Sequence, residues 1–297
     1  MMKFPDIKNE KLIKKLNHPE KKVDVVIDTD TYNEVDDQFA IAYALRSSEH
    51  MSVEAIYAAP FHNNRSKGPK DGMLKSYEEI FRLLNLMDVN KNNFVFKGST
   101  GYLNGADVPR ESDAARDLIN RAKNYDEEDP LYVLATGAIT NIASAILLEP
   151  EIIKSIVIVW LGGNAVFWPE TREFNLRQDM FASKLILNCG VPLVRIPCMG
   201  VTSHLTTTIP ELEYYLKNKS DLGTYLLNNV KDYINDSDCA SKVIWDITTV
   251  AWLINPEWIK SSIVHSPVLT DNYTWSVDSS RHFIRSADFV SRDQILA

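Results

Sequence analysis

Four aspartates lie within ten residues near the start of the chain, in the stretch VDVVIDTDTYNEVDDQFAIAYAL. They are Asp28, Asp30, Asp36 and Asp37. The apolar run before them predicts a buried strand and the pattern after them predicts a helix, so the carboxylates fall where a strand meets a helix. Crowded carboxylates repel each other unless a positive charge lies among them, and a divalent cation with oxygen ligands supplies that charge. The stretch therefore predicts a metal site.

Short apolar runs alternate with helical patterns through the first two thirds of the chain. Strands are expected at 23–28, 52–59, 94–98, 131–137, 155–163 and 192–199. Amphipathic helices are expected at 36–46, 72–87, 112–123, 140–148 and 179–188. This alternation predicts an α/β, Rossmann-like fold whose mostly parallel sheet is flanked by helices. The carboxyl ends of such strands meet at one edge, where ligands bind.

The pattern changes after residue 205. Helices are expected at 209–218, 221–235 and 243–254, and the segments TWSV and RHFIRSADF predict a small antiparallel addition at the C-terminal end. No composition break marks a linker within the 297 residues. One domain spanning residues 1–297 is therefore expected.

Composition argues against several classes of partner. The formal net charge is -8, and no basic block interleaved with aromatic residues suggests nucleic-acid binding. The first residues are too charged for a signal peptide, and no apolar run approaches the length of a membrane span. Cys189, Cys198 and Cys239 are scattered, without disulfide or zinc spacing. A cytoplasmic protein without a membrane or nucleic-acid partner is expected.

Polar residues also follow the other expected strands. They are Asn63 and Asn64 after the second strand, Thr136 and Gly137 after the fourth, and Asn164 after the fifth. Further along the chain come Glu173 and Asn175, and then Trp245 and Asp246 at the start of a helix. We expect these side chains to meet the aspartates at one edge of the sheet.

The order of these motifs resembles the nucleoside hydrolases, a family of calcium-dependent N-ribohydrolases that includes inosine-uridine preferring enzymes. The shared elements are the aspartate cluster, Asn63, ATGAITNIA (135–143), the glycines of LGGN, EFN (173–175) and Asp246. The resemblance implies hydrolysis of the N-glycosidic bond of ribonucleosides to ribose and free base. It also implies a homodimer or a homotetramer.

The resemblance assigns roles to matching residues. The implied Ca²⁺ ligands are Asp30, Asp37, Asp246 and the main-chain oxygen of Thr136. The implied ribose contacts are Asp36, Asn63, Glu173 and Asn175. Asp28 would support the cluster from behind, and Asp30 would take a proton from the attacking water. An oxocarbenium-like transition state, as in other glycosidic cleavages, would follow.

Three positions depart from the family pattern. Trp245 stands where many members carry a proton-donating histidine; it can instead stack on a purine, as in the purine-preferring branch, so purine nucleosides are expected. Five residues, Thr31 to Val35, separate Asp30 from Asp36, a longer connection than the family usually has. The segment before EFN is short, so Asn164 or Trp168 would occupy the 5′-hydroxyl pocket.

Three alternatives stay open. His62 could donate a proton to the leaving base, or it could be a solvated loop residue. The DTDT motif also fits a haloacid dehalogenase-like phosphatase, with Asp28 as nucleophile, Asp30 as acid/base and Mg²⁺ as the metal. A protein that binds calcium and ribosyl compounds without turnover is the other rival.

Overall fold

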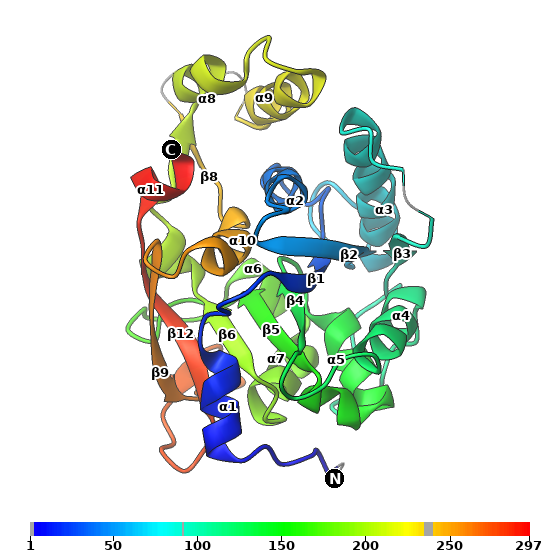
Figure 1. The fold of residues 1–297 in the computed structure, drawn as a ribbon, viewed down its shortest axis with the longest axis vertical. Helices are drawn as coiled ribbons and strands as arrows, with labels where there is room; N and C mark the ends of the chain where they lie inside the picture. The colour runs from blue at the N-terminus through cyan, green and yellow to red at the C-terminus, as the bar shows by residue number, and fades with distance from the viewer. Residues whose placement is uncertain (1–2, 91, 235–239) are drawn as a thin grey trace.

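An eight-stranded sheet forms the centre of the computed structural model, which describes residues 3–90, 92–234 and 240–297 (Figure 1). Its strands run in the order β3-β2-β1-β4-β5-β6-β12-β9. Their bounds are β1 Val23–Thr29, β2 Met51–Ala58, β3 Val95–Lys97, β4 Leu131–Ala135, β5 Ile156–Leu161, β6 Leu193–Ile196, β9 Ile259–His265 and β12 Phe283–Val290. Every neighbouring pair is parallel except β12 with β9. The predicted mostly parallel α/β sheet is confirmed.

Helices cover both faces of the sheet. Their bounds are α1 Asn9–Leu16, α2 Asp37–Arg46, α3 Pro69–Leu86, α4 Asp113–Ala122, α5 Thr140–Leu148, α6 Phe174–Gln178, α7 Met180–Asn188, α8 Ile209–Leu216, α9 Asp221–Tyr233, α10 Ile247–Ile254 and α11 Arg292–Leu296. Helices α2, α3 and α10 contribute to one apolar cluster, and α1, α4, α5 and α7 contribute to another. In the described residues, no helix combines the length and apolar character that crossing a membrane requires.

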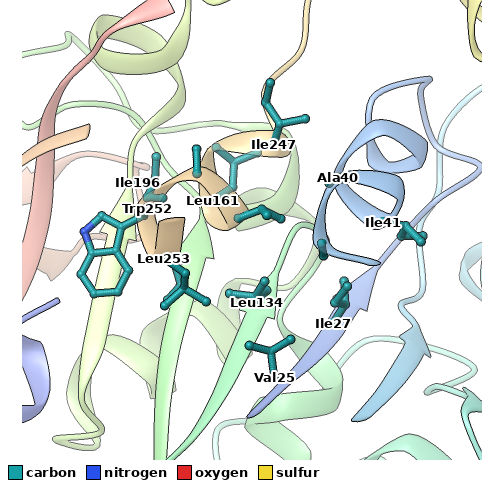
Figure 2. Close-up of a cluster of buried hydrophobic side chains, with 14 of the residues drawn as sticks. Val25, Ile27, Ala40, Ile41, Leu134, Leu161, Ile196, Ile247, Trp252 and Leu253 are labelled. Carbon is teal, nitrogen blue, oxygen red and sulfur yellow. The ribbon is translucent and has the colours of Figure 1, made fainter. Parts of the chain in front are cut away.

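The alternation of side chains along the strands explains these two clusters. Val25 and Ile27 of β1 join the cluster under α2 and α10, whereas Val26 between them joins the opposite cluster. Because both faces are covered, the strands are apolar almost throughout, as parallel strands in α/β proteins are. Figure 2 shows part of the first cluster, where Leu134 of β4 is in register with Ile27 of β1.

Two pairs of short strands complete the C-terminal part. Strands β7 (Thr206–Thr208) and β8 (Ser241–Val243) pair antiparallel, as do β10 (Val268–Leu269) and β11 (Trp275–Ser276). The expected helix over 243–254 is wrong at its start, because β8 takes up residue 243 and α10 begins only at Ile247. The end expected for the preceding helix at residue 235, and Cys239, lie outside the described residues.

The C-terminal addition also enlarges the main sheet. RHFIRSADF supplies most of β12, which lies parallel to β6 and antiparallel to β9. Small antiparallel strands are thus present at the C-terminal end as expected, and β12 in addition extends the parallel order by one strand. Helix α1, which the sequence analysis did not predict, packs beside β12 and buries Leu12 and Leu16.

Removal of the Leu134 side chain tests the first apolar cluster. Leu134 has no exposed surface, so Leu134→Ala leaves a cavity and is expected to lower the free energy of unfolding by about 2–5 kcal/mol. Val277→Ala is the control, because Val277 is 77% exposed and its change should be within about 0.5 kcal/mol. Urea unfolding measures both. A loss below about 1 kcal/mol for Leu134→Ala would contradict this packing.

Candidate active site

The predicted acidic residues converge at the carboxyl ends of the central strands. Asp28 is in register with Ala135 at the end of β4, so the residues after β1 and β4 lie next to each other. Asp37 begins α2, and Asp246 immediately precedes α10. Carboxylate oxygens of Asp36, Asp37 and Asp246 all lie within 4.8 Å of one another, and all three residues are buried. This group is called the acidic cluster below.

Asp37 is held by neutral hydroxyl groups. Its Oδ1 accepts hydrogen bonds from the Thr29 hydroxyl and from the Thr136 hydroxyl, the latter at 2.9 Å. Burial, followed by the nearby charge of Asp36, raises the pKa of Asp37 to about 7. The same two causes raise the pKa of Asp246 well above its usual range, and Asp246 also shares a hydrogen bond with Asp37. Without a cation, Asp37 and Asp246 therefore favour the protonated form.

Asp30 is the least satisfied member of the site. It has no exposed surface, and neither carboxylate oxygen has a hydrogen-bond partner among the described residues. Burial raises its pKa well above the usual range, and the charges of Asp37 and Glu34 raise it further. A buried carboxylate without a partner is costly, and a hard divalent cation beside it removes that cost. The residues present thus fit a metal ion.

Asp28 lies behind this group. Its Oδ1 accepts a hydrogen bond of 2.7 Å from the Asn141 amide on α5, and its other oxygen has no partner among the described residues. Burial raises the pKa of Asp28 to about 7. A fully buried carboxyl facing an asparagine cannot reach an external phosphate, so its position does not suit the nucleophile of a phosphatase.

Asp36 has both carboxylate oxygens occupied by the protein itself. Oδ2 accepts from the Trp245 amide at 2.8 Å, and Oδ1 lies 3.3 Å from Nζ of Lys242. The same ammonium lies 2.6 Å from Glu34. Although burial lowers the pKa of Lys242, the charges of Asp36 and Glu34 raise it overall. Lys242 was not among the predicted site residues, because no motif contains it and only the fold brings it to Asp36.

A polar pocket of about 290 Å³ opens beside the acidic cluster. Predicted residues that line it are Asp36, Asp37, Thr136, Asn164, Glu173, Asn175, Trp245 and Asp246. Trp168 lines it as well, together with Asn33 and Glu34 of the longer loop, and Arg172, Cys198 and Met199. Asp28, Asp30, Asn63 and His62 are not among the lining residues. His62 is exposed and its ring faces Ser66 at 3.4 Å, in keeping with a solvated loop residue.

The EFN segment is built into the wall of the pocket. Glu173 caps α6 and accepts hydrogen bonds from the amides of Gly163, Asn175 and Leu176 at 2.8–3.0 Å. Burial raises its pKa. The Asn175 amide donates to the main-chain oxygen of Thr136 at 3.0 Å. This oxygen is the carbonyl expected to bind metal, and Asn175 therefore fixes its position.

Two predicted sugar contacts bind other parts of the protein. The Asn63 amide donates to Oδ1 of Asn33 at 2.7 Å, and its own oxygen accepts from the Arg65 amide at 2.8 Å. Asn164 donates to the Glu170 carbonyl at 3.0 Å and accepts from the Met199 amide at 3.1 Å. Asn33 thus stands between Asn63 and the pocket, a consequence of the longer connection after Asp30.

The fold and the site together define a class of protein. A buried acidic cluster at the carboxyl edge of a parallel sheet, open to a polar pocket, is typical of a metal-dependent α/β enzyme. The sequence matches the family described as inosine-uridine preferring nucleoside hydrolase over residues 25–284, and the chain belongs to this family. It is a hydrolase that acts on N-glycosyl compounds, and the family is generally metal-dependent.

Individual relatives differ in the substrate named for them. The pyrimidine-specific ribonucleoside hydrolase RihA of Escherichia coli O1:K1 / APEC is 26% identical over 247 residues, covering 75% of this chain and 77% of RihA. The plant nucleoside hydrolase PpNRh1 matches with a TM-score of 0.73 and 20% identity over 94% of this chain and 97% of its own. The purine-preferring ribonucleoside hydrolase of Gardnerella vaginalis matches with a TM-score of 0.72 and 20% identity over 92% and 95%. These two structures share the fold.

The raised pKa values of Asp28 and Asp37 predict an unusual pH dependence of stability without metal. Both are near 7 in the folded chain, whereas an exposed aspartate titrates near 4, so the folded state binds more protons between these values. The free energy of unfolding in EDTA should therefore fall by more than about 2 kcal/mol as pH rises from about 5 to about 7.5. Urea unfolding at several pH values measures this slope.

Calcium and a substitution serve as controls for this slope. Saturating calcium should flatten it, because a cation favours the ionised carboxylates. Asp28→Asn should also reduce it, because one of the two titrating groups is gone. A free energy of unfolding that rises with pH in EDTA over this interval would contradict the raised pKa values of Asp28 and Asp37.

Proposed function

We propose that this chain hydrolyses ribonucleosides, preferably purine nucleosides, to ribose and free base, with Ca²⁺ in the acidic cluster and Asp30 as general base. The observation that carries the proposal is the Asp30 carboxylate, which is buried beside the cluster with both oxygens free of hydrogen bonds within the described chain. Structural carboxylates in protein interiors are normally hydrogen-bonded. One without such bonds is suited to bind a cation and a water.

The residues of this site have separate proposed roles in metal binding and proton transfer. A bound divalent cation supplies positive charge that orients a water and makes it more acidic. Asp30 would be the proton acceptor for a water in the site, because a neighbouring positive charge would keep its carboxylate ionised at neutral pH. Asp30, Asp37 and Asp246, with the carbonyl of Thr136, would hold the cation. Their positions agree with these roles: Asp37 and Asp246 are within the acidic cluster, and Asn175 fixes the carbonyl.

The sugar would bind across the adjoining wall of the pocket. Asp36 would accept a hydrogen bond from the ribose 2′-hydroxyl, while Glu173 and Asn175 would position the ribose ring. Asn63 would also contact the ribose once the sugar displaces Asn33 from the Asn63 side-chain amide. Buried carboxylates around the anomeric carbon stabilise the positive charge that develops as the bond to the base breaks. Asn164 and Trp168 would contact the 5′ end, because both line the pocket.

Trp245 supports the preference for purines. It lines the pocket directly beside Asp246, where its indole ring can stack on the leaving base. A larger aromatic base gains more area from this contact, and stacking on the indole would make a purine easier to protonate at N7 from solvent. The cytoplasmic location and the homodimer or homotetramer expected from the sequence stay predictions.

A panel of nucleosides tests the proposed reaction. Adenosine, inosine, guanosine, uridine and cytidine are incubated with enzyme in calcium or in EDTA, and reducing sugar is measured. Ribose release should require calcium, and Asp30→Asn should lower kcat by about 10²–10⁴ because the base is lost. Asp278→Asn, an exposed aspartate, should leave the rate unchanged. Calcium and ribose binding without ribose release from any nucleoside would favour the binding protein and contradict turnover.

Substitution of Trp245 tests the preference for purines separately. Stacking on an aromatic ring contributes about 1–3 kcal/mol, so Trp245→Ala should lower kcat/KM for inosine by about 5- to 150-fold. Trp245→Phe retains an aromatic face and should lose much less. The loss for uridine should also be smaller than the loss for inosine. Unchanged turnover of inosine by Trp245→Ala would show that the tryptophan only packs.

A further inference from the structure

Lys242 places a positive charge of the chain itself beside the acidic cluster. Its side chain is only 7% exposed, and Nζ contacts Glu34 at 2.6 Å, the Val243 carbonyl at 2.7 Å and Asp36 at 3.3 Å. An ammonium has three hydrogens to donate, and these contacts use all of them. Strand β8, which carries Lys242, is fixed by its pairing with β7. The charge is therefore held in place.

This charge distinguishes Asp36 from the other carboxylates. Asp36 has a cationic partner and a main-chain amide, one for each oxygen. Asp37 is bound only by two threonine hydroxyls and by Asp246, and Asp30 has no partner within the described residues. Yet Asp36 lies close enough to Asp37 and Asp246 for all three to bind one ion. Geometry alone would make it a metal ligand.

We propose that Lys242 is a positioning residue that withholds Asp36 from the metal and keeps it for the sugar. An ion pair already satisfies Asp36, so an incoming divalent cation gains little from it and also meets the repulsion of the ammonium. The metal is then left to the remaining carboxylates. Asp36 stays oriented towards the pocket that it lines. This inference rests on the proposed nucleoside hydrolase site.

Glu34 couples the longer loop to the same lysine. It belongs to the segment Thr31–Val35, and its carboxylate and that of Asp36 share one ammonium. Asn33, next to it, binds Asn63. Lys242 therefore joins the loop after β1 to the segment before α10, and both of these border the pocket. The longer loop after Asp30 is thus tied to Lys242 through the ion pair of Glu34.

Calcium affinity tests the inference without any need for turnover. Lys242→Met removes the charge but keeps an unbranched apolar side chain of similar length. We expect it to bind calcium at least about tenfold more tightly than the unmodified chain, because Asp36 is released and a repulsive charge is gone. Calcium titration by calorimetry measures this affinity. Lys242→Arg, which retains the charge, and Lys217→Met, an exposed lysine paired with Glu213, should stay within about twofold.

Melting temperatures provide a second readout. Loss of Lys242 leaves the buried Asp36 carboxylate without a cationic partner, so Lys242→Met should have a lower melting temperature in EDTA than the unmodified chain. Calcium should raise the melting temperature of this variant by more than it raises that of the unmodified chain. The double variant Lys242→Met with Asp36→Asn has no unpaired charge and should fold more readily. Its calcium affinity should return to within about threefold of the unmodified chain, since the added ligand is gone.

Several outcomes would overturn the inference. They are calcium affinity in Lys242→Met that is unchanged or weaker, a double variant that keeps the full gain, and the absence of calcium binding in all of these proteins. If the variants show the expected calcium affinities but no nucleoside yields ribose, the inference about Lys242 is supported and the proposed reaction is refuted. Ribose release by the unmodified chain, with unchanged calcium affinity in Lys242→Met, would support the proposed reaction and refute the inference about Lys242.

Discussion

The burial of several carboxylates at one edge of the sheet is the constraint on which the rest of this site depends. Asp28, Asp30, Asp36, Asp37 and Asp246 are all at most 5% exposed, and burial disfavours the charge on every one of them. The chain compensates each carboxylate in a different way. Asp28 accepts a hydrogen bond from an amide, Asp37 accepts two from hydroxyls, Asp36 is paired with an ammonium, and Asp246 shares a hydrogen bond with Asp37. Asp30 has no hydrogen-bond partner among the described residues. Asp30 is therefore the carboxylate that the described chain satisfies least, which is why it is the one proposed as the general base.

Small residues make this arrangement sterically possible. A side chain on Gly98 would come within 2.0 Å of the Ala58 carbonyl and 2.5 Å of the Asn141 amide, the group that holds Asp28. A side chain on Gly137 would lie 3.2 Å from Cβ of Asp30. Glycine at position 98 lets the chain after β3 pack closely against β2 and α5, and glycine at position 137 lets the loop after β4 approach Asp30. The close packing of the sheet edge and the electrostatics of the site thus depend on the same positions.

Most of the fold could be predicted because its signals are local and repeated. Continuous apolar strands such as SIVIVWL could only be covered on both faces, and the carboxyl ends of parallel strands bring distant motifs such as DTD and ATG together without knowledge of any contact. Strand β8 was missed because three residues carry little periodicity and gain their pairing only from β7. The family motifs located several of the residues that line the pocket, but they gave no information on hydrogen bonds.

Lys242 and Asn33 show why the hydrogen bonds of the site could not be predicted from the sequence. Lys242 lies more than 200 positions from Asp36 along the chain, as an isolated lysine in a region of mixed polarity. Asn33 belongs to a loop whose unusual length was visible, but length does not specify which side chain turns inwards. Both contacts arise from the tertiary structure: β7 and β8 bring the lysine, and the turn after Asp30 brings the asparagine.

The pairing of Asn33 with Asn63 has a consequence for specificity. A sugar that is to reach Asn63 must replace a hydrogen bond of 2.7 Å that already exists, so binding gains only the difference between two similar contacts. The proposed general base Asp30 offers no such competition, because neither of its carboxylate oxygens has a hydrogen-bond partner within the described chain. In the proposed site, the segment Thr31–Val35 therefore weakens the gain from the Asn63 contact with the sugar, whereas the preference among bases rests on Trp245, which lines the pocket beside Asp246.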